Sequence, residues 1–184
     1  MKKILLLVFY GVGAFLFVGF FPIFLRYILL ILFSAGLAVF LFSARWSVWD
    51  RSLKDLFWLV ASFLWLANIF SFFAAGLNFS LGVFLVFIIV FFALFLGLSG
   101  RGGRGVFICG FCGALVISEF FWAVAFLPFG YLTLSGLVFV VFYLVWTVFL
   151  NHLKGSLGKE IIFKNLAFSA AMMVILLLST RWQP

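Results

Sequence analysis

The run Leu81–Leu98 decides the class of fold, and it reads LGVFLVFIIVFFALFLGL. No side chain in this run is charged or can form a hydrogen bond. A helix that is apolar on every side is buried in a large protein core or in a membrane. At a rise of about 1.5 Å per residue, about 18 residues cover roughly 27 Å, close to the thickness of the hydrocarbon core of a bilayer. The run therefore predicts a transmembrane helix.

Six further apolar runs surround this one. The predicted spans cover residues 4–21, 27–42, 56–75, 81–98, 106–127, 131–150 and 165–180. The first run follows Lys2 and Lys3 but is too long for a signal peptide and lacks a cleavage site, so we expect an uncleaved helix. Pro22 and Arg26 separate the first run from the next, and a single helix across residues 4–42 would be about 60 Å long, twice the thickness of the hydrocarbon. A tight hairpin is expected there.

The composition supports the same class. The chain has 184 residues, of which 68% are hydrophobic and 9% are charged, whereas soluble domains carry about 25% charged residues. We therefore predict an all-α, polytopic integral membrane helix bundle with seven transmembrane helices. Residues 1–184 are expected to form a single transmembrane domain, with the lipid bilayer as its solvent.

The distribution of positive charge predicts the orientation. Of the twelve Lys and Arg, ten lie in alternate gaps between spans: Lys2, Lys3, Arg45, Arg51, Lys54, Arg101, Arg104, Lys154, Lys159 and Lys164. The other gaps hold only Arg26 and Arg181. Cytoplasmic loops carry the excess of Lys and Arg, so the N-terminus is predicted inside and the C-terminus outside. The charges are too scattered for a nucleic-acid partner, and the pattern favours a bacterial or archaeal cytoplasmic membrane.

Small and polar residues at helical spacing predict the contact faces of three spans. The stripes are Trp58, Ala61, Trp65, Asn68 and Ser71; Gly110, Ala114 and Ser118; and Asn165, Ser169, Met172 and Leu176. Small residues about four apart let helix backbones approach closely in lipid. We therefore predict the spans 56–75, 106–127 and 165–180 in the interior of the bundle, and 81–98 at its edge.

Glu119 is the only charged side chain deep inside a predicted span. It lies about 20 Å from the inner end of its span, and Asn68 about 18 Å from the inner end of its own, so the two can meet if these helices pack together. Trp65 and Trp122 complete this candidate polar site. A carboxylate in the bilayer costs at least about 2.5–3.5 kcal/mol. Because no Lys or Arg lies inside a span, we expect the carboxyl to keep its proton unless water reaches it.

Three interpretations of Glu119 follow. It lines a cavity as a proton- or substrate-binding acid, or it fixes the packing of two helices through a hydrogen bond to Asn68, Trp122 or a backbone carbonyl. In the third interpretation it docks onto a polar group of another membrane subunit. Ionisable residues inside membranes are functional candidates by default.

Two other motifs give weaker indications. Cys109 and Cys112 have the Cys-x-x-Cys spacing of redox proteins, but a redox pair needs an exposed thiolate, and small residues on a helix usually serve packing. A zinc site would need two further ligands, and His152 is the only histidine. The segment Gly100–Gly105 matches G-x-G-x-x-G, but its flanks are spans rather than a βαβ unit. We expect no metal and no cofactor.

The function expected from these residues is non-enzymatic. No Asp lies within a span and no paired acids occur there, which excludes the usual hydrolytic and acid–base sets. The first hypothesis is an accessory or assembly subunit that binds other membrane proteins through its small-residue and polar stripes; a homo-oligomer is left open as a separate alternative for its partners. The alternative is a small transporter or proton-coupled carrier that uses Glu119, although helices broken in paired positions, the usual sign of a transport site, are missing from the pattern. A thiol oxidoreductase ranks third.

Overall fold

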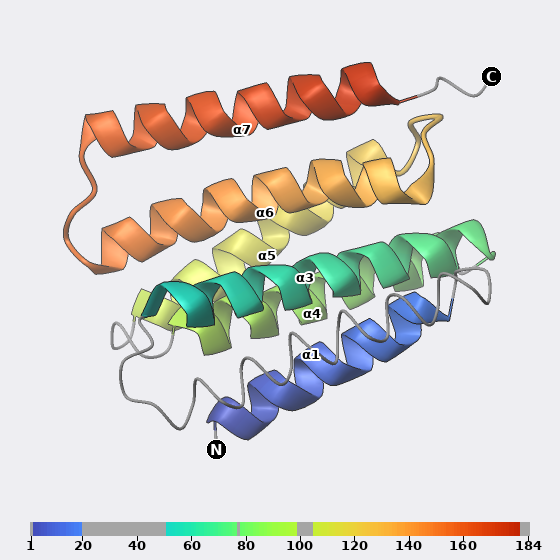
Figure 1. Ribbon diagram of the computed structural model, residues 1–184, viewed down its shortest axis with the longest axis horizontal. Coiled ribbons are helices and arrows are strands. Elements are labelled where there is room, and N and C mark those ends of the chain that lie inside the picture. The colour runs from blue at the N-terminus through green and yellow to red at the C-terminus, as the bar shows by residue number, and fades with distance from the viewer. Residues whose placement is uncertain (1, 20–50, 77, 99–104, 181–184) are drawn as a thin grey trace. The chain divides into compact units, whose positions relative to one another are not determined.

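The computed structural model describes residues 2–19, 51–76, 78–98 and 105–180, and all regular structure in these residues is α-helical (Figure 1). The helices are α1 (Lys2–Val18), α3 (Arg51–Ala74), α4 (Phe79–Leu98), α5 (Gly105–Val124), α6 (Tyr131–Leu153) and α7 (Lys159–Ser179). The predicted all-helical class is confirmed. The four helices α4 to α7 have the length and composition needed to cross a membrane. The predicted span 27–42 lies outside the described residues.

The helices extend further into charged sequence than the predicted spans. α3 begins at Arg51 rather than at residue 56, and α7 begins at Lys159 rather than at residue 165. The prediction began these two spans after the last charged residue of the preceding loop, Asp55 or Lys164, but backbone hydrogen bonding in a helix does not require uncharged side chains. In the first turns of α7, Lys164 Nζ lies 2.7 Å from a Glu160 carboxylate oxygen, and both side chains are exposed. Such i,i+4 pairs stabilise an exposed helical turn.

The chain divides into two compact units, Met1–Asn68 and Ile69–Pro184. In the first unit, α1 packs on the N-terminal part of α3. Their shared core consists of Tyr10, Ala14 and Phe17 from α1 and of Ala61, Leu64 and Ala67 from α3. The alanines let the two backbones approach closely, and the aromatic rings fill the space beside them. Trp58, Ala61 and Asn68 of the predicted stripe on α3 are buried.

In the second unit, α4 packs on α5, α5 on α6, and α6 on α7. The short connections after α5 and after α6 make α5 antiparallel to α6, and α6 antiparallel to α7 (Figure 1). Gly110, Ala114 and Ser118 are all buried, so the predicted contact stripe of α5 is confirmed. The closest approach involves Gly97 of α4, where an added methyl group would overlap the indole of Trp146.

The predicted places of α4 and α7 are wrong within the second unit. α7 buries only Ser169 among its described residues, whereas α4 buries Gly82, Val86, Val90, Ala93, Leu94 and Leu98. The prediction assumed that an entirely apolar helix stays at the edge, in contact with lipid. In a bilayer, lipid is as apolar as Leu, so packing follows the shape of the helix surface rather than its hydrophobicity. Gly82, Ala93 and Gly97 give α4 a surface that neighbours can approach.

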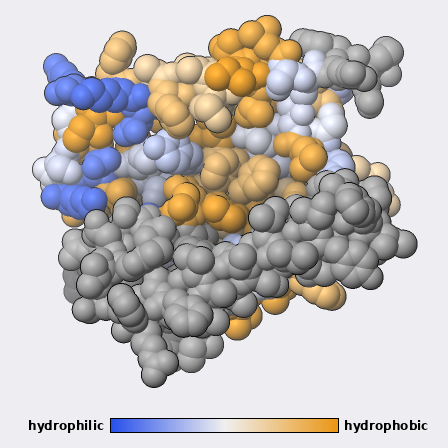
Figure 2. Space-filling model, in the orientation of Figure 1, coloured by the Kyte–Doolittle hydropathy of each residue, from blue (hydrophilic) through white to orange (hydrophobic). Residues whose placement is uncertain are grey.

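Hydrophilic residues gather at one end of the second unit, where α6 ends and α7 begins (Figure 2). Exposed residues there are His152, Lys154, Lys159, Glu160 and Lys164. Large exposed side chains elsewhere on α7 are apolar, including Phe163 and Leu178. The second unit therefore combines a charged end with apolar flanks.

Two glycines on the packed face of α5 provide a test of this arrangement. A Cβ atom on Gly113 would overlap Leu94 and lie 2.9 Å from Phe149 Cε2, whereas one on Gly110 would lie 3.6 Å from its nearest neighbours, which is ordinary contact. We expect Gly113→Ala to lower the free energy of unfolding by about 1–3 kcal/mol because of overpacking. Gly110→Ala is expected to leave it unchanged or raise it by up to about 1 kcal/mol, since Ala favours the helix.

The measurement is unfolding of both variants by sodium dodecyl sulfate in mixed micelles, followed by circular dichroism. Because both substitutions gain the same helix propensity, their difference isolates the close contact of α5 with α4 and α6. Equal stabilities would contradict this packing.

Candidate functional site

α5 has two chemically different faces. Its packed face carries the small residues described above, together with Cys109, Ile117 and Phe121. Its outer face is exposed in the described structure and consists of Ile108, Phe111, Cys112, Leu115, Val116, Glu119, Trp122 and Ala123. Apart from Glu119, this outer face is almost entirely apolar. The helix therefore presents one carboxyl on a surface that is otherwise suited to lipid or to another membrane helix.

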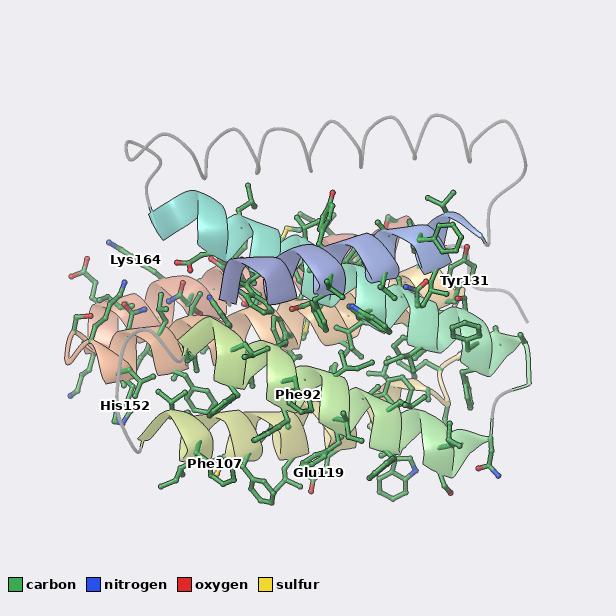
Figure 3. All side chains as sticks on the ribbon, turned by 90° about the horizontal axis from the view of Figure 1, so that it is seen from below. Phe92, Phe107, Glu119, Tyr131, His152 and Lys164 are labelled. Carbon is green, nitrogen blue, oxygen red and sulfur yellow. The ribbon has the colours of Figure 1, made fainter. Side chains whose placement is uncertain are left out.

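The Glu119 side chain points away from the packed helices of its unit (Figure 3). Leu115 and Val116 lie one turn before it on the outer face, and Trp122 and Ala123 lie one turn after it. None of the described residues forms a hydrogen bond or an ion pair with its carboxyl. The structure thus places the acid on an exposed surface of its unit rather than inside the packed core of that unit.

Trp65 and Asn68 have partners in the first unit. Trp65 Nε1 donates a hydrogen bond to the Phe9 carbonyl oxygen at 2.9 Å, and Asn68 Nδ2 donates one to the Gly13 carbonyl oxygen at 2.8 Å. The Phe9 ring also stacks on Trp65, with ring centroids 5.4 Å apart. Both polar side chains therefore attach α3 to α1, one helical turn apart.

Among the four residues of the candidate polar site, the structure brings together two pairs. Trp65 and Asn68 share the contact of α1 with α3, and Glu119 and Trp122 share the outer face of α5. The pairs belong to different units, so the meeting of Asn68 with Glu119 stays a prediction. The sequence interpretation left out Cys112, which lies two turns before Glu119 on the same face. Helical periodicity contains the signal for this placement, because Cys112, Leu115, Glu119 and Trp122 follow the spacing of one helix face.

The two cysteines differ in their surroundings. Both are free thiols; Cys109 is buried in the packed face of α5 and Cys112 is exposed on the outer face. The described residues contain no group of three or more His, Cys, Asp or Glu that could hold a metal ion. The burial of Cys109 among small residues agrees with the packing role expected for it.

Several hydroxyl groups in the second unit bond to their own helix. Ser118 Oγ donates to the Leu115 carbonyl oxygen at 2.9 Å, and Thr147 Oγ1 donates to the Leu144 carbonyl oxygen at 2.9 Å. Ser135 Oγ likewise donates to the Tyr131 carbonyl oxygen. Ser and Thr hydroxyls in transmembrane helices commonly donate their hydrogen bond to a backbone carbonyl of their own helix. These hydroxyls therefore serve their own helices and give little support to a polar path through the unit.

The chemistry available on the outer face of α5 is that of one carboxyl beside one indole ring. A single acid can donate or accept hydrogen bonds, or pair with a cation, but acid–base catalysis usually requires a second titratable group in reach. The comparisons with protein-family models, curated proteins and solved structures found no match to this chain.

Asn68 allows the attachment of α1 to α3 to be tested. We expect Asn68→Leu to lower the stability of the folded protein by about 0.6–2 kcal/mol, because it removes an interhelical hydrogen bond in an apolar environment. Ser62→Ala is the matched control, since Ser62 is also buried on α3 but donates only to the Trp58 carbonyl of its own helix. Unfolding by sodium dodecyl sulfate, followed by tryptophan fluorescence, measures both variants. The role assigned to Asn68 fails if the two substitutions have the same small effect.

Proposed function

We propose that this chain is an integral membrane protein with seven spans and acts as a non-enzymatic accessory or assembly subunit. It binds another integral membrane protein through the outer face of α5. The observation that carries the proposal is the exposure of Glu119 on a helix that has the length and composition of a membrane span.

Exposure has opposite meanings in water and in lipid. In water an exposed carboxyl is fully hydrated, whereas in hydrocarbon it has no partner and costs at least about 2.5–3.5 kcal/mol when charged. The neutral acid also lacks the hydrogen bonds it would make in water. A protein helix that covers Glu119 with a polar group removes this cost, and lipid tails cannot. In the bilayer, the isolated chain therefore has a higher free energy than the chain in such a complex.

The surroundings of Glu119 suit a protein contact. Trp122 is 55% exposed and Phe111 is 43% exposed on the same face. Aromatic side chains are enriched at protein interfaces, where they fill pockets on the partner. Leu115 and Val116 lie between Phe111 and Trp122 along this face and add surface for van der Waals contact. Helix association in membranes depends mainly on such contact.

Charge at the ends of the helices supports the proposed orientation. The connection between α6 and α7 contains Lys154 and is followed by Lys159 and Lys164, whereas the connection between α5 and α6 has no charged residue. The antiparallel neighbours place these two connections at opposite ends of the second unit. The positive-inside rule then puts the connection after α6 in the cytoplasm. A bacterial or archaeal cytoplasmic membrane is the proposed location.

The alternative of a proton-coupled carrier has less support. It requires water to reach Glu119 through the protein, yet this carboxyl points away from the packed helices of its unit (Figure 3). The hydroxyls of Ser118, Ser135 and Thr147 bond to their own helices instead of facing a shared polar path.

Two glycines test the proposed orientation. Gly130 and Gly158 each precede a helix and have negative φ angles of −63° and −104°, and a Cβ atom added at either would meet no neighbouring atom within 4 Å. In a variant with Cys109→Ala and Cys112→Ala, we expect Gly130→Cys in intact cells to react with a maleimide that cannot cross membranes. Gly158→Cys is expected to react only after the membrane is opened, because the connection after α6 lies inside. The reverse labelling pattern would overturn the orientation.

A bulky substitution on the outer face of α5 tests the proposed function. Val116 is 50% exposed, so Val116→Trp should leave the fold intact while preventing a partner helix from approaching. The control is Leu178→Trp on α7, at a position that is 81% exposed. Native mass spectrometry of protein extracted gently from its own membrane reads out the complexes.

We expect a second protein at fixed stoichiometry with the unsubstituted chain and with Leu178→Trp. With Val116→Trp, its occupancy should fall at least about tenfold, equivalent to about 1.4 kcal/mol of binding free energy. If the unsubstituted chain is recovered only as a monomer or as a homo-oligomer, the subunit proposal fails. If both substitutions release the partner to the same extent, the outer face of α5 is not the binding surface.

A further inference from the structure

We infer that the partner presents to the outer face of α5 a transmembrane helix that carries a Lys or Arg side chain at the depth of Glu119. This inference rests on the proposed function and specifies the chemistry of the partner. It follows from the charges of the chain, from the neighbours of Glu119 and from what each possible occupant would supply.

The chain cannot neutralise Glu119 with a cation from its own predicted spans. All twelve Lys and Arg lie outside the predicted spans. The described Lys154, Lys159 and Lys164 are exposed at the end of the second unit where α6 meets α7. The predicted span 27–42 has the sequence YILLILFSAGLAVFLF and contains no basic residue. A complementary charge at this depth must therefore come from another molecule.

A cation inside the bilayer has the same requirement as Glu119. Lys or Arg near the centre of a span costs about 2.5–3.5 kcal/mol on insertion scales. Charged side chains within membranes therefore pair with one another or face polar cavities. Joining one buried cation to one buried carboxylate satisfies both groups at the same contact. This mutual need makes charge complementarity a strong source of specificity between membrane helices.

Trp122 adds a second feature that favours a cation. It lies three residues after Glu119 on the same exposed face, so the Cβ atoms of the two residues are about 5–6 Å apart. Lys and Arg are attracted to the face of an indole ring, and this attraction is stronger where water is absent. A carboxyl and an indole side by side therefore form a suitable receptor for an ammonium or guanidinium group.

A second copy of this chain fits the outer face less well. Two copies related by a twofold axis would present the same surface to each other, and Glu119 would then face an acid instead of a base. Lipid supplies no polar group at this depth, because headgroups lie at the surface of the bilayer. The geometry and the charges together select a cationic helix over both of these occupants.

The experiment uses the full chain in phosphatidylcholine vesicles and synthetic transmembrane peptides as the probe. Each peptide is a Leu- and Ala-rich helix of about 22 residues, long enough to span the bilayer. One carries a single Lys at the depth of Glu119, a second carries Leu at that position, and a third carries the Lys about 9 Å nearer one end, or about six residues along the helix. Energy transfer between a donor on the protein and an acceptor on the peptide measures binding.

We expect the peptide with Lys at the matching depth to bind at least about tenfold more tightly than the Leu peptide or the displaced Lys peptide. Glu119→Gln should abolish this preference, and Trp122→Leu should reduce it by about threefold as the indole contact is lost. The comparison among the three peptides uses the unsubstituted chain, so it remains decisive even where a variant folds poorly.

Cys112 locates the bound peptide. A peptide with one cysteine two turns from its Lys is expected to form a disulfide with Cys112 under mild oxidation, in the Cys109→Ala background. The Leu peptide with the same cysteine should cross-link at least about tenfold less. Equal cross-linking of the Lys peptide and the Leu peptide would overturn the inference.

Two other results would also overturn it. Equal binding of all three peptides to the unsubstituted chain would show that this face does not select a cation. Self-association of the chain that depends on Glu119 would make a second copy the occupant. If either result appears while Val116→Trp still releases a native partner, the subunit function stands and only the cationic helix is rejected. If no native partner exists, the proposed function itself fails.

Discussion

Buried polar groups must find partners without water, and this constraint organises the contacts of the described helices. Ser118 donates to the carbonyl of Leu115 on its own helix, and Asn68 donates to the carbonyl of Gly13 on a neighbouring helix. In the first case the bond satisfies one helix, and in the second it attaches α3 to α1. Glu119 has neither kind of partner among the described residues. In the proposed function, a partner protein supplies the polar contact that Glu119 lacks within its own unit.

A second constraint is that lipid does not drive helices together as water does. Helices in a bilayer associate where their surfaces fit, and small residues make a close fit possible. The packed face of α5 illustrates this, because Gly113 leaves room for Leu94, Val145 and Phe149. Gly97 does the same for Trp146 on α6. A large apolar side chain on an exposed face is ordinary in this setting, whereas a carboxyl on such a face requires an explanation.

The sequence predicted the helices well because apolar length and helical periodicity are local signals. The contact stripes on α3 and α5 were also predictable, since small residues repeat every three or four positions along them. The starts of α3 at Arg51 and of α7 at Lys159 were missed because charged residues interrupt an apolar run without interrupting the backbone hydrogen bonds of a helix. The prediction that α7 is more buried than α4 was also wrong. It depends on how side-chain shapes fit across helices, and no single helix sequence contains that information.

The candidate site was only partly predictable for the same reason. Periodicity alone separates Glu119 from the stripe of Gly110, Ala114 and Ser118 and groups it with Cys112 and Trp122. Depth alone predicts a meeting of Glu119 with Asn68, and this stays a prediction because the two residues belong to different units. Depth does not contain the direction in which a side chain points, and the one described contact of Asn68 Nδ2 is with the Gly13 carbonyl oxygen.

The two faces of α5 affect different properties. The packed face affects folding, and the proposed function assigns recognition to the outer face. Residues on the packed face contact helices of the same chain, so changes there act on folding through close packing. On the outer face, the ring of Phe111 contacts Phe87 of α4 with ring centroids 5.6 Å apart, whereas the Glu119 carboxyl forms no hydrogen bond or ion pair with the described residues. A single charged group on such a face specifies a partner more sharply than many apolar ones, because any apolar surface can replace lipid but only a complementary polar group can satisfy a carboxyl. In the proposed function, Glu119 therefore gives an otherwise apolar face a chemical requirement that only a partner with a complementary polar group meets.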